Sequence, residues 1–128
     1  MAKYGYQKIV ELSFEDAVVE VKKVLKDQGF GVLSEIDVQK KMKEKLDKDM
    51  DEYLILGACN PSFAFKALQF EQDIGLLLPC NVIVYKKGTD VVVSAIIPSV
   101  AMAFVDNDAL KNIAQDAEEK LKIAIDNL

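Results

Sequence analysis

The sequence contains no histidine, no arginine and no tryptophan. Without histidine, the chain alone can form neither a Ser-His or Cys-His catalytic pair nor an imidazole metal site. All 16 basic residues are lysines, so the bidentate guanidinium contacts that often bind phosphate or carboxylate are absent. Most familiar hydrolase and zinc-enzyme classes are therefore excluded, and the composition leaves open whether the protein is an enzyme at all.

The chain also lacks the features that nucleic-acid and membrane partners require. Its net charge is −5, which disfavours electrostatic binding to nucleic acid or to an anionic membrane. No run reaches the roughly 18 consecutive apolar residues of a membrane span, and residues 1–6 lead into a polar-patterned strand rather than a signal peptide. Two cysteines in such a chain favour free thiols over a structural bridge. We therefore expect a cytoplasmic protein with no nucleic-acid or membrane partner.

The length and the hydrophobic pattern predict a fold. With 128 residues, 51% of them hydrophobic, the chain can bury a core without disulfide or metal, and we expect residues 1–128 to form one domain. The expected strands cover residues 6–12, 30–36, 53–58, 81–86 and 91–97, and the expected helices 14–28, 38–46, 61–70 and 108–125. This order predicts an α+β fold, with one twisted, mainly antiparallel sheet covered by two long helices and short helices inserted between strands. Residues 75–79 and 98–105 are apolar but fit neither pattern.

Two Cys-Asn dipeptides stand at strand boundaries. Cys59-Asn60 lies between a buried strand and a proline-marked helix start, and Cys80-Asn81 lies where a proline turn enters the next strand. Backbone N–H groups at a helix start can lower a thiol pKa and bind an anion, so Cys59 is placed for a reactive or ligand-binding role. The alternative is that both cysteines are small buried residues and that Asn60 is only a helix cap.

Two charged positions are weaker candidates for the same site. Glu35 shares one face of an extended segment with Asp37, which could make a carboxylate pair, although an exposed rim with Asp37 as a helix cap is the favoured explanation. Lys66 lies on the helix that follows Asn60 and could point toward the same cleft, or it could be an ordinary solvated lysine.

Three segments carry a resemblance to a known family: GFGVLSEID at residues 29–37, ILGACNP at 55–61 and GLLLPCNV at 75–82. In this order they resemble the domain of unknown function 302 family, over nearly the whole chain. The resemblance implies a β-α-β(4)-α type fold with extra short helices, and a homodimer. It implies no established activity, substrate or cofactor.

Three functions remain open at this point. The first is a dimeric, non-enzymatic binding domain that takes a small ligand or a soft metal in a pocket lined by Cys59, Asn60, Cys80, Asn81, Glu35 and Lys66. The second is a redox sensor or thiol enzyme that uses Cys59 as a thiolate. The third is a structural or assembly protein with both cysteines buried and a dimer face over residues 98–104.

The residue types restrict the metal. A zinc site needs about four ligands, whereas this chain offers two thiols and no imidazole. Cuprous ion needs fewer soft ligands, so it fits Cys59 and Cys80 better. The sequence names no cofactor.

Overall fold

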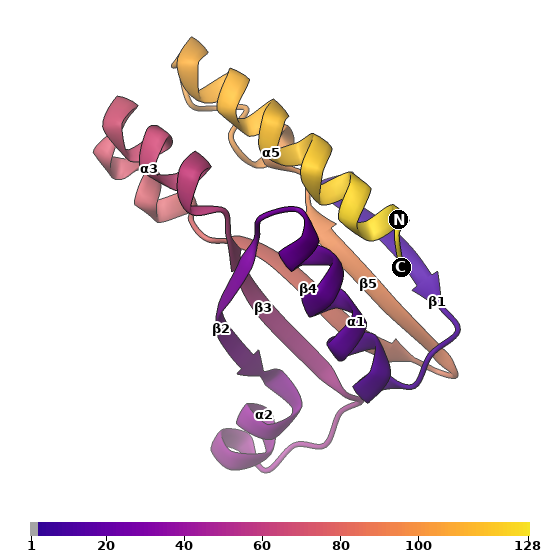
Figure 1. Ribbon diagram of the computed structural model, residues 1–128. Coiled ribbons are helices and arrows are strands. Elements are labelled where there is room, and N and C mark those ends of the chain that lie inside the picture. The colour runs from indigo at the N-terminus through magenta and orange to yellow at the C-terminus, as the bar shows by residue number, and fades with distance from the viewer. Residues whose placement is uncertain (1–2) are drawn as a thin grey trace.

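The structure, a computed structural model, describes residues 3–128 and contains one five-stranded antiparallel sheet (Figure 1). The strands lie in the spatial order β1-β5-β4-β3-β2. In chain order the elements are β1 (Gly5–Val10), α1 (Phe14–Asp27), β2 (Gly31–Asp37), α2 (Val38–Leu46), β3 (Tyr53–Cys59), α3 (Pro61–Phe70), the 3₁₀ helix η1 (Gln72–Leu77), β4 (Cys80–Lys87), β5 (Asp90–Ile96), α4 (Pro98–Ala101) and α5 (Asp108–Asp126). The predicted α+β fold is confirmed.

Both long helices, α1 and α5, lie on the same face of the sheet and contact each other (Figure 1). Strand residues alternate between the two faces, and those directed at the helices form the core. The fully buried ones are Leu56, Ala58, Val82, Val84, Val93 and Ala95. Against them pack the apolar stripes of α1 and α5, which include Val21, Leu25, Leu121 and Ile125. Among the described residues, no helix covers the opposite face of the sheet (Figure 1).

Side-chain caps set the starts of three helices, as the sequence predicts. Ser13, Asp37 and Asn107 each accept a hydrogen bond from a backbone N–H in the first turn of α1, α2 and α5, at 3.0 to 3.3 Å. At its other end α1 stops before Gly29, whose φ of +85° lies in the left-handed region that glycine adopts without strain.

Two apolar segments form helices that the sequence pattern does not predict. Residues 72–77 are the 3₁₀ helix η1, and residues 98–101 are one turn of α-helix, α4. Both are shorter than two α-helical turns, so they are too brief to show a periodic stripe, and prolines at positions 79 and 98 border them. They build, with α3, the end of the molecule that carries the candidate site.

Hydrogen bonds join the last helix to the first strand. The Tyr6 hydroxyl donates to Asp126 Oδ1 at 2.7 Å, and the Lys8 ammonium donates to the backbone oxygen of Leu128 at 2.5 Å. The bond to the Asp126 carboxylate, together with partial desolvation, raises the pKa of the Tyr6 phenol. The first strand and the C-terminal end of the chain therefore lie side by side (Figure 1).

None of the helices in residues 3–128 has both the length and the apolar character needed to cross a membrane. The cytoplasmic location and the division into a single domain over residues 1–128 stay predictions.

Candidate functional site

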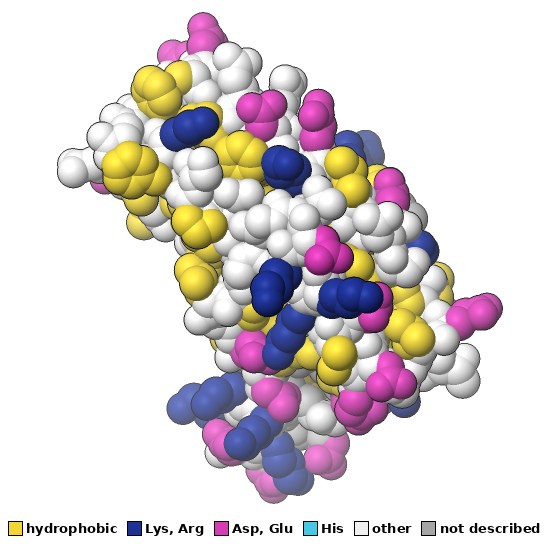
Figure 2. Space-filling view, in the orientation of Figure 1, with side chains coloured by type: hydrophobic (Ala, Val, Ile, Leu, Met, Phe, Trp, Pro, Cys, Tyr) yellow, Lys and Arg dark blue, Asp and Glu magenta, His cyan; other side chains and the backbone are white. Residues whose placement is uncertain are grey.

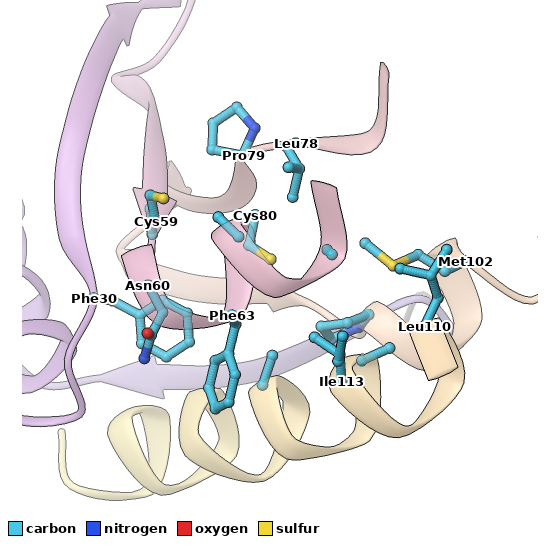
Figure 3. A pocket seen from close by; sticks show the side chains of 16 residues that line it. Phe30, Cys59, Asn60, Phe63, Leu78, Pro79, Cys80, Met102, Leu110 and Ile113 are labelled. Atoms are coloured by element: carbon cyan, nitrogen blue, oxygen red, sulfur yellow. The ribbon is translucent and has the colours of Figure 1, made fainter. Parts of the chain in front are cut away.

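A small apolar cavity lies where the ends of β3 and β4 meet α3 and α5 (Figure 3). Its volume is about 40 Å³. The strands contribute Ala58, Cys59 and Cys80, and the helices contribute residues that include Phe63, Ala67, Leu110 and Ile113. Asn60 lies at the junction of β3 and α3 and also lines it. Apart from the two thiols and Asn60, every lining side chain is apolar.

The sheet register brings the two cysteines together. Cys80 is the first residue of β4 and pairs with Ala58 of β3, so Cys59 lies one residue beyond the cross-strand partner of Cys80. Both thiols are free, both are half-buried, and both belong to the wall of the same cavity (Figure 3). The two cysteines therefore lie at the same end of neighbouring strands and line one cavity, and their convergence on a binding pocket stays a prediction.

Burial keeps both thiols protonated. It raises the pKa of Cys59 above its usual value and raises the pKa of Cys80 from 9.0 to about 11, with the nearby charge of an ionised Cys59 adding to the effect on Cys80. The helix start after Asn60 does not reverse the shift at Cys59. At neutral pH neither side chain is a thiolate, which is the reactive form of cysteine. The geometry therefore gives no support to the hypothesis that Cys59 is a reactive thiolate.

Asn60 holds the junction between β3 and α3 in place. It occupies the N-cap position before Pro61, as predicted, but its side chain makes no capping hydrogen bond to α3. Its Nδ2 points instead to the backbone oxygen of Gln28 at the end of α1, at 3.5 Å. A side chain at Gly29 would have its Cβ only 3.0 Å from this Nδ2, so the glycine leaves room for the contact.

Three predicted site residues do not line the cavity. Asn81 follows Cys80 in β4, and because successive strand residues point to opposite faces, its side chain lies on the open face of the sheet. Glu35 lies on the edge strand β2 and forms an ion pair with Lys22 of α1 at 3.0 Å. Lys66 is exposed on α3, whose cavity-lining residues are Phe63, Ala64 and Ala67. The prediction that these three residues line one pocket together with the two cysteines is therefore wrong.

Met102, which the sequence analysis did not select, lines the cavity with a third sulfur atom (Figure 3). It is the residue after α4, and it also lines a neighbouring hollow together with Cys80. The signal for it in the sequence is weak, because methionine in an apolar segment of undefined structure is an ordinary core residue.

The donor atoms around the cavity are soft. Within residues 3–128, no group of three or more cysteine, aspartate or glutamate side chains is positioned to hold a metal ion. Hard ions such as calcium and magnesium require several oxygen ligands, which the cavity lining does not supply. The set of two thiols and one thioether matches only ions that prefer sulfur, such as cuprous copper.

A family model and a solved structure that match this chain both point to the same protein family. A family model described as Domain of unknown function DUF302 matches residues 6–128. The crystal structure of an uncharacterized conserved protein DUF302 from Bacillus stearothermophilus is similar over 98% of this chain and 98% of its own, with 30% sequence identity and a TM-score of 0.91. A search of the curated proteins finds no match.

Proposed function

Because this chain belongs to the domain of unknown function DUF302 family, whose description specifies no activity, we propose its function from the cavity: a non-enzymatic binding domain that holds a cuprous ion at Cys59 and Cys80. The observation that carries the proposal is that two free thiols from different strands line one small, apolar cavity. The thioether of Met102 is the candidate third ligand.

The size and the lining of the cavity favour an ion over an organic ligand. A volume of about 40 Å³ is close to the roughly 30 Å³ that one water molecule occupies in the liquid, and well below the roughly 150 Å³ of an engineered cavity that binds benzene. A single ion is small enough for this space, whereas a benzene-sized molecule is not. Two thiolates and one monovalent cation leave a single negative charge, a smaller burial cost than two unpaired thiolates.

The raised thiol pKa values set the pH dependence of binding. A metal displaces the proton from each thiol, so the affinity increases with pH while the thiols remain protonated in the free protein. Binding also stabilises the folded state, because the unfolded chain does not bring Cys59 and Cys80 to one cavity.

Anaerobic titration of the reduced protein with cuprous ion, in competition with a chromogenic cuprous chelator, tests the proposal. We expect one ion per chain, and an affinity weakened at least about tenfold in Cys59→Ser and in Cys80→Ser. Met102→Leu, which keeps the volume and removes the thioether, should weaken binding less than either cysteine change. Met50→Leu, at a position outside the cavity, is the matched control and should bind as the wild type does. Failure to withdraw copper from the chelator, or full affinity in both cysteine variants, would sink the proposal.

A small apolar molecule is the second candidate, and the almost wholly apolar lining favours it. An organic guest requires the walls to move apart, and residues from five elements would have to adjust. Native mass spectrometry of the protein purified from its source separates the two candidates, since copper and an organic guest add different masses.

A further inference from the structure

The face of the sheet that α1 and α5 leave open has no charged side chain in its three middle rows. The strand registers define these rows as Ile9-Val92-Tyr85-Tyr53, then Gln7-Ser94-Ile83-Ile55-Ile36, then Gly5-Ile96 beside Asn81-Gly57-Ser34. By contrast, 29% of the whole chain is charged, and lysine, aspartate and glutamate side chains are spread over the helix-covered side (Figure 2). A sheet face exposed to water normally alternates to polar residues, so this face has the composition of a buried surface.

Two glycines, a pair of stacked tyrosines and a shallow hollow shape the open face. A Cβ atom at Gly5 would lie 2.6 Å from Ser94 Oγ, and one at Gly57 would lie 2.9 Å from Pro79 Cγ, so the two glycines make room for these side chains of the same chain to lie low on the sheet. The rings of Tyr53 and Tyr85 stack with centroids 5.4 Å apart. Beside them is a shallow hollow of about 450 Å³, whose lining also includes Tyr4 and Ile96. Flat aromatic and aliphatic side chains of this kind are typical of interface cores.

The apolar surface continues from the sheet to the end formed by η1 and α4. Asn81 and Ile96 line both the hollow on the open face and a second one of about 220 Å³ next to η1 and α4. Leu76, at the edge of that second hollow, is 87% exposed. At the outer strands, Ile9 and Ile36 are 55% and 46% exposed. The patch therefore extends across all five strands and onto the adjoining end.

The open face supplies about half of the area of a standard dimer interface. With strands about 4.8 Å apart and residues about 3.3 Å apart, the open face measures roughly 20 by 20 Å in plan. This plan area of about 400 Å² is half of the about 800 Å² per partner of a standard protein interface, and exposed residues at the adjoining η1–α4 end, such as Leu76, add to it.

We propose that a second copy of this chain covers the open face, with the two sheets packed face to face about a two-fold axis. The absence of charge singles out this occupant. A membrane surface, a nucleic acid or a charged peptide would be recognised by charges that the face does not have. In a two-fold dimer the same patch meets itself, so any charge near the axis would face a like charge, and an uncharged apolar face avoids that repulsion. Packed sheets lie about 10 Å apart, a spacing that isoleucine and tyrosine side chains fill.

Sedimentation equilibrium of the wild-type protein over a range of concentrations gives the first test. We expect a mass of twice 14.2 kDa at high concentration and dissociation on dilution. The double variant Ile9→Lys, Ile36→Lys places charge at two positions that are already exposed in the single chain, so it should fold and should weaken dimerisation at least about a hundredfold. Val19→Lys is the matched control: it changes a residue that is 67% exposed on α1, on the opposite side of the sheet, and should leave the dimer intact.

Tyrosine iodination of the wild-type protein gives a second test that requires no variant. Tyr53 and Tyr85 lie on the open face, whereas Tyr6 points to the helix side, where it bonds to Asp126. Dilution should increase the labelling of Tyr53 and Tyr85 while that of Tyr6 stays constant. A wild-type protein that is monomeric at every concentration overturns the proposal. So does a dimer that survives the double lysine variant, or one in which all three tyrosines respond equally to dilution.

Discussion

The pKa of Cys80 has a measurable consequence for stability at alkaline pH. In the folded protein burial raises this pKa to about 11, whereas the unfolded chain titrates near the ordinary value of 9.0. Below pH 9 the thiol is protonated in both states. Between pH 9 and pH 11 the unfolded state loses the proton and the folded state keeps it, so the free energy of unfolding falls as the pH rises through this window. Since one pKa unit corresponds to about 1.4 kcal/mol, the loss from Cys80 alone approaches about 2–3 kcal/mol.

Urea unfolding of the reduced, metal-free protein at a series of pH values from 7 to 11 measures this loss. Lysine side chains titrate in the same range, so the useful quantity is the difference between the wild type and Cys80→Ala, which share every lysine. We expect the variant to start out less stable because it loses packing, and the gap between the two proteins to narrow by about 2 kcal/mol toward pH 11. In Cys59→Ser the free energy of unfolding should fall slightly less steeply with pH than in the wild type, because the charge of Cys59 contributes to the raised pKa of Cys80.

A gap between wild type and Cys80→Ala that stays constant from pH 7 to pH 11 would refute the reasoning. It would mean that the Cys80 thiol is hydrated in the folded state and is not buried against the cavity wall as the structure has it. Rapid alkylation of Cys80 at neutral pH, at the rate of an unstructured cysteine peptide, would lead to the same conclusion.

Three further predictions concern the fold. Leu121→Ala, at a position that is 1% exposed between α5 and the sheet, should lower the free energy of unfolding by about 2–5 kcal/mol, whereas Ile123→Ala, 46% exposed on the same helix, should change it by under about 0.5 kcal/mol; equal losses would contradict the assigned helix face. Asn107→Ala removes the cap of α5 and should cost about 1 kcal/mol in urea unfolding, and no loss would mean that water caps the helix equally well. Asp126→Asn should lower the pKa of Tyr6 toward 10.0 in an absorbance titration, and an unshifted pKa would show that the carboxylate does not perturb the phenol.

Local side-chain chemistry explains why most of the fold follows from the sequence. The caps at Ser13, Asp37 and Asn107 are three-residue signals that need no tertiary contact, and α3 begins at Pro61 as the Asn-Pro pair predicts. The 3₁₀ helix η1 and the single turn α4 were missed because neither is long enough to have a periodic stripe. Their positions depend on contacts with α3 and α5, which no local pattern encodes.

The site follows from the sequence only in part. Cys59 and Cys80 could be brought together by reasoning because both mark the ends of neighbouring antiparallel strands. Strand alternation directs Asn81 to the face opposite that of Cys80, and it likewise directs Cys59 to the face opposite that of Ala58, so Cys59 reaches the cavity at the edge where β3 ends. The prediction for Lys66 required the rotation of α3 about its axis, which the sequence of a ten-residue helix does not fix. The prediction for Glu35 could not include its ion-pair partner Lys22, because Lys22 lies on another element.

The pairing of β1 with β5 constrains the order in which the molecule can assemble during synthesis. Gly5 of β1 lies opposite Ile96, and Tyr6 is bonded to a residue 120 positions later. When β1 leaves the ribosome it has no strand to pair with, and when α1 follows, only one of the five strands has been translated. The hairpin of β4 and β5 must emerge before the sheet can close, and the helix that completes the core is translated last. A nascent chain of this protein therefore exposes β1 until β5 has been translated, and slowing the ribosome before β5 should lengthen that exposure.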